Sequence, residues 1–464
     1  MKHSLRALIT YKLVISLFLL TAFFSCKKET DNNHFAHQEN VTKSGNTYGH
    51  LKQTKTYTSE VLQDWIKLNM QLLRTNASKL NNFVMIHHWA YSSIALYEAV
   101  VPGMPEYQTL SKQLNEMPSM PETEPGKAYH WPTVANTVMA AMTRYFYMDS
   151  ITQVGKELII ALEDRLNTLY QQEVDAASFN RSKAFGKEVA ERVFKWALTD
   201  GYLTIHPSYI LPVGPGFWEK TLPGFLSPQR PYWSTNRSLM EGSIAASQIP
   251  PPPAFSTDPS SPFYAMAKEV YDISNNLTNE QKEQGYFWRD VPGGAHAHWL
   301  NIYLQVLYEQ SNRTMLDKAA LIYAKMGITQ SDARISCWKA KYTYNQLRPV
   351  TFINAVIDIE KDWIPLITTP NHPEYPAAHS SFSAPAADVL TREFGDNYAF
   401  TDDTYNFISL PARDFNSFHH AALDAGESRI LAGIHYRPSV AAGQKLGIAV
   451  SKYMYDHIKF KKGS

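Results

Sequence analysis

Three short clusters of basic and imidazole side chains lie between residues 338 and 440 of the sequence. In the first cluster, "CWKAKYTYNQLRPV", Lys341 and Arg348 are seven residues apart. On one continuous helix, which we expect Pro349 to end directly after Arg348, this spacing would place both cations on the same face, about 10 Å apart along the axis. Two long cationic side chains could then converge on one anion. Solvated surface charges often have the same spacing, so the pair alone identifies no site.

The second cluster, "HPEYPAAHSSFSAPAADVL", brings His379 to the start of an expected helix. Ser380 and Ser381 are typical helix caps and Pro385 is tolerated in a first turn, so we expect the helix to start near Ser381. His379 would then lie beside backbone N–H groups that have no acceptor within the helix and that favour anions. A histidine that only packs or caps at this terminus is an equally good interpretation of the stretch.

The third cluster is "ESRILAGIHYRP". Arg429 belongs to an expected helix, and Gly433 is a typical residue at which a helix ends. His435 would then leave the turn that follows. On an unbroken helix Arg429 and His435 would lie on different faces, so a break at Gly433 is what would let both side chains reach one point.

Long segments with the apolar spacing of helices must position these clusters. Examples are "SEVLQDWIKLNMQLLR", "FVMIHHWAYSSIALYEAV" and "AFGKEVAERVFKWALTDG". In one segment Leu316, Ala319, Ala320 and Tyr323 form a single helical stripe. Between about residues 200 and 258, prolines and glycines exclude a long helix. We therefore predict an all-α fold of helix bundles in two halves, joined by a Pro-rich irregular crossing.

The N-terminus has the pattern of a signal peptide. Basic residues precede an apolar run from Leu13 to Phe24, which Cys26 follows. The run is shorter than the roughly 20 residues of a membrane-spanning helix. Its end is similar to the lipobox of bacterial lipoproteins, so we predict a lipoprotein signal peptide over residues 1–26 and an acylated Cys26. A plain secretory cleavage nearby is the alternative.

Residues 27–56 are polar and lack apolar periodicity, so we predict a tether there and a folded domain over residues 57–464. The protein would then be extracytoplasmic and held at a bacterial membrane by the lipid anchor only. With Cys26 acylated, Cys337 is the only other cysteine, so the mature chain has no intramolecular disulfide.

Composition excludes one class of partner. The chain has 464 residues, 44% of them hydrophobic, which is enough for a large core. Its formal net charge of +1 gives no electrostatic reason to expect nucleic acid as a partner.

Taken together, the three clusters resemble the signature of the vanadium-dependent haloperoxidase and type 2 phosphatidic acid phosphatase superfamily. Lys341 with Arg348 and Pro349 matches its first part, and Ser428-Arg429 followed by His435 matches its third. The second part is present as Pro376-Ala377-Ala378-His379. Three spaced motifs in the right order are far more specific than any one. The resemblance implies a fold of two four-helix bundles side by side.

The resemblance also implies roles. A vanadate cofactor, or a substrate phosphate with no cofactor, would be bound by three cations and a backbone amide: Lys341, Arg348, Arg429 and the amide near Ala378. His435 would bind vanadium or attack phosphorus, and His379 would be the acid–base group. His372 matches a histidine typical of bromoperoxidases, whereas Trp338 matches a tryptophan typical of chloroperoxidases, so the halide is left open. Trp338 could equally belong to the apolar stripe of its helix.

Two positions depart from the family pattern. Ala377 replaces a serine whose hydroxyl donates to the anion in the family. One hydrogen bond to the anion is therefore missing unless Ser380 or Ser381 supplies it. Ser439 stands where the phosphatases carry an aspartate, so we expect the nucleophilic histidine to lack an orienting partner, which leans away from phosphatase.

Three functions remain after the sequence alone. The first is a haloperoxidase that uses hydrogen peroxide and halide as small-molecule substrates. The second is an acid phosphatase that acts on a phosphate ester through a phosphohistidine. The third is a non-catalytic surface lipoprotein that binds glycans or partners, suggested by 10 Trp and 27 Tyr.

Overall fold

The computed structural model describes residues 52–291, 294–360 and 363–463. The predicted signal peptide, Cys26 and nearly all of the predicted tether lie outside these residues. The last tether residues are part of the folded unit, because the Oγ1 of the buried Thr54 donates to the carbonyl of Val100 at 2.9 Å and the Nε1 of Trp131 donates to that of Lys52 at 2.7 Å. The domain therefore begins a few residues before the predicted Tyr57.

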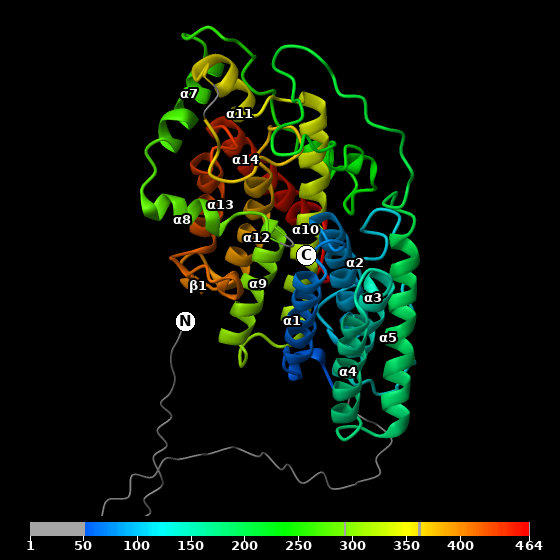
Figure 1. Cartoon of the computed structure of the whole chain (residues 1–464). Helices are drawn as coiled ribbons and strands as arrows, with labels where there is room; N and C mark the ends of the chain where they lie inside the picture. Colours follow the sequence, from blue (N-terminus) through cyan, green and yellow to red (C-terminus); the bar gives the residue numbers. More distant parts are fainter. Residues whose placement is uncertain (1–51, 292–293, 361–362, 464) are drawn as a thin grey trace, which may run out of the picture. The chain divides into compact units, whose positions relative to one another are not determined.

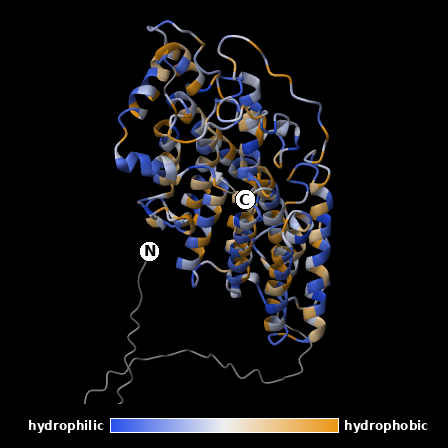
Figure 2. Cartoon of the chain, in the orientation of Figure 1, coloured by the Kyte–Doolittle hydropathy of each residue, from blue (hydrophilic) through white to orange (hydrophobic). Residues whose placement is uncertain are grey.

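The first half of the domain is a helical bundle, blue to teal in Figure 1. Each helix combines hydrophobic and hydrophilic residues (Figure 2), and the hydrophobic ones form one continuous core. The helix α3 is central to the bundle, because it packs against α1, α2, α4 and α5. The bundle consists of α1 (Glu60–Thr75), α2 (Asn82–Val100), α3 (Trp131–Tyr147), α4 (Gln153–Tyr170) and α5 (Ala176–Ala197).

A long irregular segment leads from α5 to α7 (Pro262–Ser274), as the prolines and glycines predict. It contains only a 3-10 turn, Trp233–Thr235, and the one-turn helix α6 (Ser243–Ala246). Two further helices, α8 (Asn279–Phe287) and α9 (Gly294–Glu309), lead to the second bundle.

The second bundle is yellow to red in Figure 1 and is built around α12 (Ala378–Phe394). This helix packs against α10 (Leu316–Tyr344), α13 (Phe418–Leu431) and α14 (Arg437–His457). The long helix α10 also packs against α2 and so joins the two halves. The smaller elements are α11 (Pro349–Phe352), a π-helical turn (Ile353–Ile357) and the antiparallel strands β1 (Phe400–Asp402) and β2 (Arg413–Phe415). The all-α prediction is confirmed.

Two glycines let α14 approach the start of α12 closely. A Cβ on Gly443 would lie 2.5 Å from the carbonyl oxygen of Ala377, and one on Gly447 would lie 2.5 Å from the Cδ of Pro385. Real Cβ atoms do not tolerate such contacts, so the two helices can pack at this distance only because these residues have no side chain.

Two local predictions were wrong. The helix α10 ends at Tyr344, because Asn345 adopts a left-handed conformation with φ 47°. Arg348 is instead the N-cap of α11, with Pro349 at its first position, so it does not share a helix with Lys341.

The start of α12 also differs from its prediction. The helix begins at Ala378 with Ala377 as N-cap and no side-chain cap, so Ser380, Ser381 and Pro385 all lie inside it. A proline inside a helix costs about 3 kcal/mol. Here α12 is buried on three sides by other helices, and that packing offsets the loss.

Within the described residues, no helix combines the length and apolar character that crossing a bilayer requires.

Candidate active site

A small cavity lies at the N-terminal end of α12. Six of the eight side chains or amides predicted as site residues line it: Trp338, His372, Ala378, His379, Arg429 and His435. They come from α10, the loop before α12, α12 itself, α13 and the turn after it. Lys341 and Arg348 are not part of this lining and lie behind it.

His435 is held by a buried carboxylate that sequence reasoning missed. Its Nδ1 donates to the Oε1 of Glu374 at 2.7 Å, and the backbone N–H of Tyr436 donates to the same oxygen at 3.0 Å. On the other side of the ring, the Nη1 of Arg348 lies 3.2 Å from Nε2 and donates to it. The proton is therefore on Nδ1, and Nε2 offers its lone pair.

The surroundings favour this neutral imidazole. Burial lowers the pKa of His435 well below its usual value, and the cations Arg348 and Lys341 lower it further. Burial raises the pKa of Glu374 to about 7, and the same two cations act against that rise. An unprotonated ring nitrogen is what a metal ligand or an attacking nucleophile requires.

Glu374 corrects the expectation drawn from Ser439. The orienting carboxylate is present, but it comes from the loop before α12 rather than from the fourth residue after His435. Ser439 therefore gives no reason to exclude a phosphatase.

Lys341 supports the turn in front of α12. Its Nζ donates to the backbone carbonyls of Pro373, Glu374 and Pro376, at 2.9, 2.9 and 2.6 Å. Burial lowers the pKa of this ammonium to about 7. Three carbonyl acceptors use all three of its protons, so in this structure the predicted oxyanion donor holds the loop and brings positive charge beneath the cavity.

Arg348 ties the same loop to the turn that carries His435. Its Nε donates to the carbonyl of His372 at 3.0 Å, and its Nη1 donates to that of Ile434 at 2.7 Å. The guanidinium thus fixes two of the predicted site histidines relative to each other.

Arg429 faces the cavity. Its Nε donates to the Ser428 hydroxyl at 3.1 Å and its Nη2 to the carbonyl of Gly285 at 3.2 Å. Among the described residues, its Nη1 has no hydrogen-bond acceptor. The break predicted at Gly433 is confirmed by its φ of +77°, which turns the chain so that Arg429 and His435 line the same cavity.

His379 is the second residue of α12 and is buried. Its Nε2 lies 3.9 Å from the Oδ1 of Asp290, a carboxylate at the edge of the cavity whose side chain is 45% exposed. Burial, and next the charge of Arg429, hold the pKa of His379 well below its usual value, so its imidazole is neutral and can accept a proton. The first-turn N–H groups beside it precede the first backbone hydrogen bond of the helix, which Ser381 makes to Ala377.

No serine replaces the family hydroxyl at position 377. The hydroxyl of Ser381 donates to the carbonyl of Ala377 at 2.9 Å. Ser380 packs toward α13 and α14, where a Cβ on Gly426 would lie 2.9 Å from its Oγ. Neither serine lines the cavity.

Trp338 and His372 lie together, with ring centroids 5.1 Å apart. The Nε1 of Trp338 donates to the carbonyl of Gln229 at 3.2 Å. Trp338 belongs to the hydrophobic core and also lines the cavity, whereas its role toward halide stays a prediction.

Sequence reasoning also missed several residues that line the cavity. Arg334 is seven residues before Lys341 on the same helix, a spacing that could have suggested it. Asn82, Gln229 and Asp290 come from other segments and carry no local signal of this kind.

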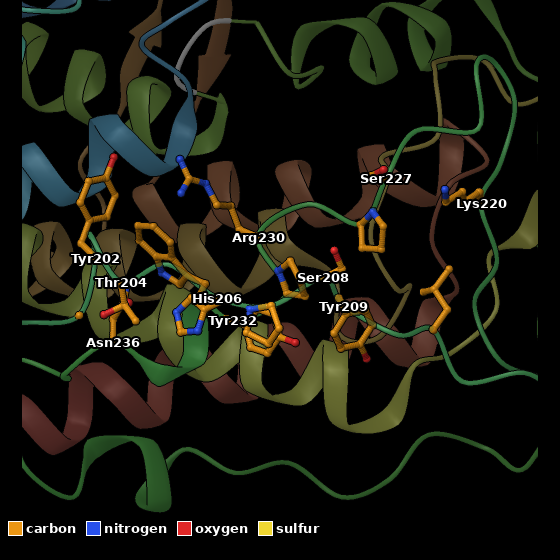
Figure 3. Close-up of a pocket in the computed structure, with 16 residues that line it drawn as sticks. Tyr202, Thr204, His206, Ser208, Tyr209, Lys220, Ser227, Arg230, Tyr232 and Asn236 are labelled. Carbon is orange, nitrogen blue, oxygen red and sulfur yellow. The ribbon is translucent and has the colours of Figure 1, made fainter.

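A larger cavity of about 540 Å³ lies on the irregular crossing. Figure 3 shows its aromatic and basic lining, which includes Tyr202, His206, Lys220 and Arg230. It shares no lining residue with the cavity at α12, so it is a separate feature of the surface.

Comparison with known proteins identifies the family. The model of the VCPO second helical-bundle domain matches residues 321–462. A bacterial vanadium-dependent iodoperoxidase of known structure is 31% identical to the chain, with 87% of this chain and 97% of that one covered and a TM-score of 0.78.

Two structures of bacterial vanadium-dependent chloroperoxidase share the fold. The apo type is 15% identical, covers 82% of this chain and 95% of its own, and has a TM-score of 0.60. The holo type is 15% identical, covers 83% of this chain and 93% of its own, and has a TM-score of 0.61. No curated protein matched the sequence.

The helical fold and the cationic, histidine-containing cavity define a protein of the vanadium haloperoxidase class. The chain belongs to the superfamily that unites vanadium haloperoxidases with type 2 phosphatidic acid phosphatases.

Proposed function

We propose that the protein is a vanadate-dependent haloperoxidase that oxidises halide with hydrogen peroxide. The observation that carries this proposal is the buried His435, whose Nδ1 is held by Glu374 and whose Nε2 is unprotonated among cations. The related iodoperoxidase makes iodide the first halide to test.

The residues present fit vanadate. The cavity supplies one neutral imidazole nitrogen together with cations and first-turn amides, which is a donor set for an oxyanion. The described residues contain no cluster of three or more His, Cys, Asp or Glu that could hold a metal ion. We assign vanadate to His435 Nε2, Arg429 and the Ala378 amide, which line the cavity, and to the charges of Arg348 and Lys341, whose donors are occupied by protein acceptors.

Each residue then has a defined task. Vanadate, when bound, supplies a Lewis acid that activates peroxide without changing its own oxidation state. His435 would hold it through Nε2, while Glu374 keeps the proton on Nδ1. His379, neutral and near Asp290, takes up and returns the proton of the incoming peroxide.

Acid phosphatase is the second candidate, and one observation favours it. An attacking histidine needs its other nitrogen held by an acceptor, and Glu374 meets that need. In this reading His435 forms the phosphohistidine, His379 protonates the leaving group and no cofactor is required. A function as a non-catalytic lipoprotein does not explain why the His435–Glu374 pair is buried, so it is the weakest of the three candidate functions.

One experiment separates these functions. Purified protein is assayed for iodide and bromide oxidation with peroxide, before and after incubation with vanadate, and for hydrolysis of a generic phosphate ester. We expect halide oxidation that depends on vanadate. Ester hydrolysis without any halide oxidation would favour the phosphatase instead. If the protein showed neither activity, the non-catalytic binding lipoprotein would be the remaining candidate.

The cellular location is part of the proposal. We place the enzyme outside the cytoplasm, attached to a bacterial membrane through acylated Cys26, on the basis of the N-terminal pattern. Its substrates there would be small and diffusible, peroxide and halide, with no nucleic acid involved.

A further inference from the structure

Arg334 is a buried cation in the cavity with no task in the mechanism above. It lies on α10, is 2% exposed and lines the same cavity as His379, Arg429 and His435. Within the described part of the chain, it forms no ion pair with a carboxylate. Burial lowers its pKa only to about 9, so the guanidinium is charged at neutral pH.

A chain of neutral groups orients Arg334 without compensating its charge. Its Nε donates to the Nε2 of His296 at 2.9 Å. The Nδ1 of His296 then donates to the side-chain oxygen of Gln330. The amide nitrogen of Gln330 donates to the carbonyl of Phe382 at 2.7 Å.

His296 must be neutral in this arrangement, since its Nε2 is an acceptor. Burial, and next the charge of Arg334, lower its pKa well below the usual value. The Nη1 and Nη2 of Arg334 make no hydrogen bond to any described residue, so the positively charged end has its donors available.

Three aromatic rings surround the guanidinium. Its Cζ lies 4.3 Å from the centroid of Phe83, 4.5 Å from that of Phe382 and 4.8 Å from that of Trp338. We call Arg334 with these three rings the Arg334 cage. Rings at these distances stabilise the cation and exclude water from it, but they cannot accept its N–H groups as a carboxylate would.

We infer that the Arg334 cage is the halide-binding subsite of the enzyme, next to the residues assigned to vanadate. A halide is a single spherical charge, which the two available N–H groups of Arg334 can hold, whereas a tetrahedral oxyanion needs many more donors. The inference rests on the proposed function. It places one of the two predicted halide residues, Trp338, in the cage and leaves His372 outside.

The cage also predicts an order among halides. An apolar, water-poor site penalises an anion by the cost of removing its hydration, and that cost falls as the ion becomes larger. The Arg334 cage should therefore bind iodide more tightly than bromide and bromide more tightly than chloride.

Arg334→Met tests the subsite, because methionine keeps much of the side-chain length and removes the charge. We expect the KM for iodide to rise about 10- to 100-fold, the range for loss of a charge-assisted contact. Vanadate binding in equilibrium dialysis and kcat at saturating iodide should change less than about threefold. Arg334→Lys keeps the charge without the planar fork and should raise the KM by less.

Arg392→Met is the matched control. Arg392 also lies over an aromatic ring, 4.4 Å from the centroid of Tyr455, but its side chain is 49% exposed and paired with Asp388. This variant should leave the KM unchanged. An unchanged KM in Arg334→Met, or a loss of vanadate equal to the loss of halide affinity, would overturn the inference.

A second measurement does not depend on turnover. Crystals of the wild type and of Arg334→Met are soaked in iodide, and the anomalous signal is compared at the Arg334 cage. We expect a peak beside the guanidinium in the wild type only. A wild type that binds iodide there but never oxidises it would contradict the proposed function alone, whereas no peak in an active wild type would contradict the cage alone. If Arg334→Met misfolds, its unfolding curve will show it. The KM of Arg334→Lys and the iodide peak in the wild type would then decide whether the Arg334 cage binds halide.

Discussion

The Nδ1 of His435 and the Oε1 of Glu374 are 2.7 Å apart, both in side chains almost without solvent exposure. A charged or highly polar pair is stable at such a depth only when its members satisfy each other. The relationship fixes which nitrogen of His435 carries the proton, and the first two predictions follow from it.

Replacing Glu374 should reduce turnover more than it reduces halide affinity. In Glu374→Ala the ring of His435 loses its orienting acceptor, and we expect vanadate affinity or turnover to fall about 10- to 100-fold. Glu374→Gln keeps an acceptor oxygen and should fall less. Glu427→Gln, which changes an exposed partner of Arg437, is the control and should be active. Full activity in Glu374→Ala would show that the pair has no orienting role.

The same carboxyl predicts a pH dependence of stability. Its pKa is raised by burial from 4.5 to about 7 in the folded state, so between these values the folded protein holds a proton that the unfolded chain has lost. The contribution of Glu374 to stability is therefore present below pH 4.5 and is lost as the pH rises through about 7. Urea unfolding of the wild type and Glu374→Gln, compared across this range, should show their difference moving in favour of the variant. A difference in the free energy of unfolding that does not change with pH would contradict this contribution of Glu374.

Replacing each of the two cavity histidines should have a different effect. His435→Ala removes the nitrogen assigned to vanadate, so the variant should retain no vanadate and show no peroxidase turnover. His379→Ala removes only a proton acceptor, so it should still bind vanadate while its turnover falls about 10²- to 10⁴-fold. Equilibrium dialysis of both variants distinguishes the roles, and equal loss of vanadate from both would refute the assignment.

Lys341 should matter for stability as well as for the anion. Lys341→Met leaves three buried carbonyls without their donor. We expect the free energy of unfolding to fall by about 3 kcal/mol or more. Lys339→Met, at an exposed position two residues earlier, should change it by less than about 0.5 kcal/mol. Chemical denaturation measures both, and equal effects would mean that the turn before α12 does not depend on the ammonium.

The lipid anchor has its own test. Cys26→Ser should release the protein from the membrane fraction, and mass spectrometry of the mature wild type should find an acylated N-terminal Cys26. An unmodified N-terminus downstream of Cys26 would favour plain secretory cleavage instead.

Much of the fold was predictable because apolar spacing and prolines are local signals. The stripe Leu316, Ala319, Ala320 and Tyr323 is fully buried, as the spacing requires. The end of α10 was not predictable in the same way, since Asn345 and not Pro349 ends it. The start of α12 was misplaced because its burial among three helices outweighs the preferences of Ser381 and Pro385.

The site residues also divide into those that sequence motifs identified and those that only the fold reveals. Motif spacing identified His379, Arg429 and His435, which the fold brings to one cavity. Glu374 was missed because its partner is 61 residues away, and only the fold reveals that distance in space. Arg334 was missed because a lone arginine in a helix usually lies at the surface, and its burial depends on rings from other helices.

Gly443 and Gly447 set how closely α14 packs against the first turns of α12. Since a methyl group at Gly443 would press on the carbonyl of Ala377, any side chain there would displace the first turn of α12, and with it the amide of Ala378 in the cavity wall. The shape of the anion site is thus adjustable from a distant seam between helices. Evolution or engineering could retune selectivity there while every residue that touches the anion stays the same.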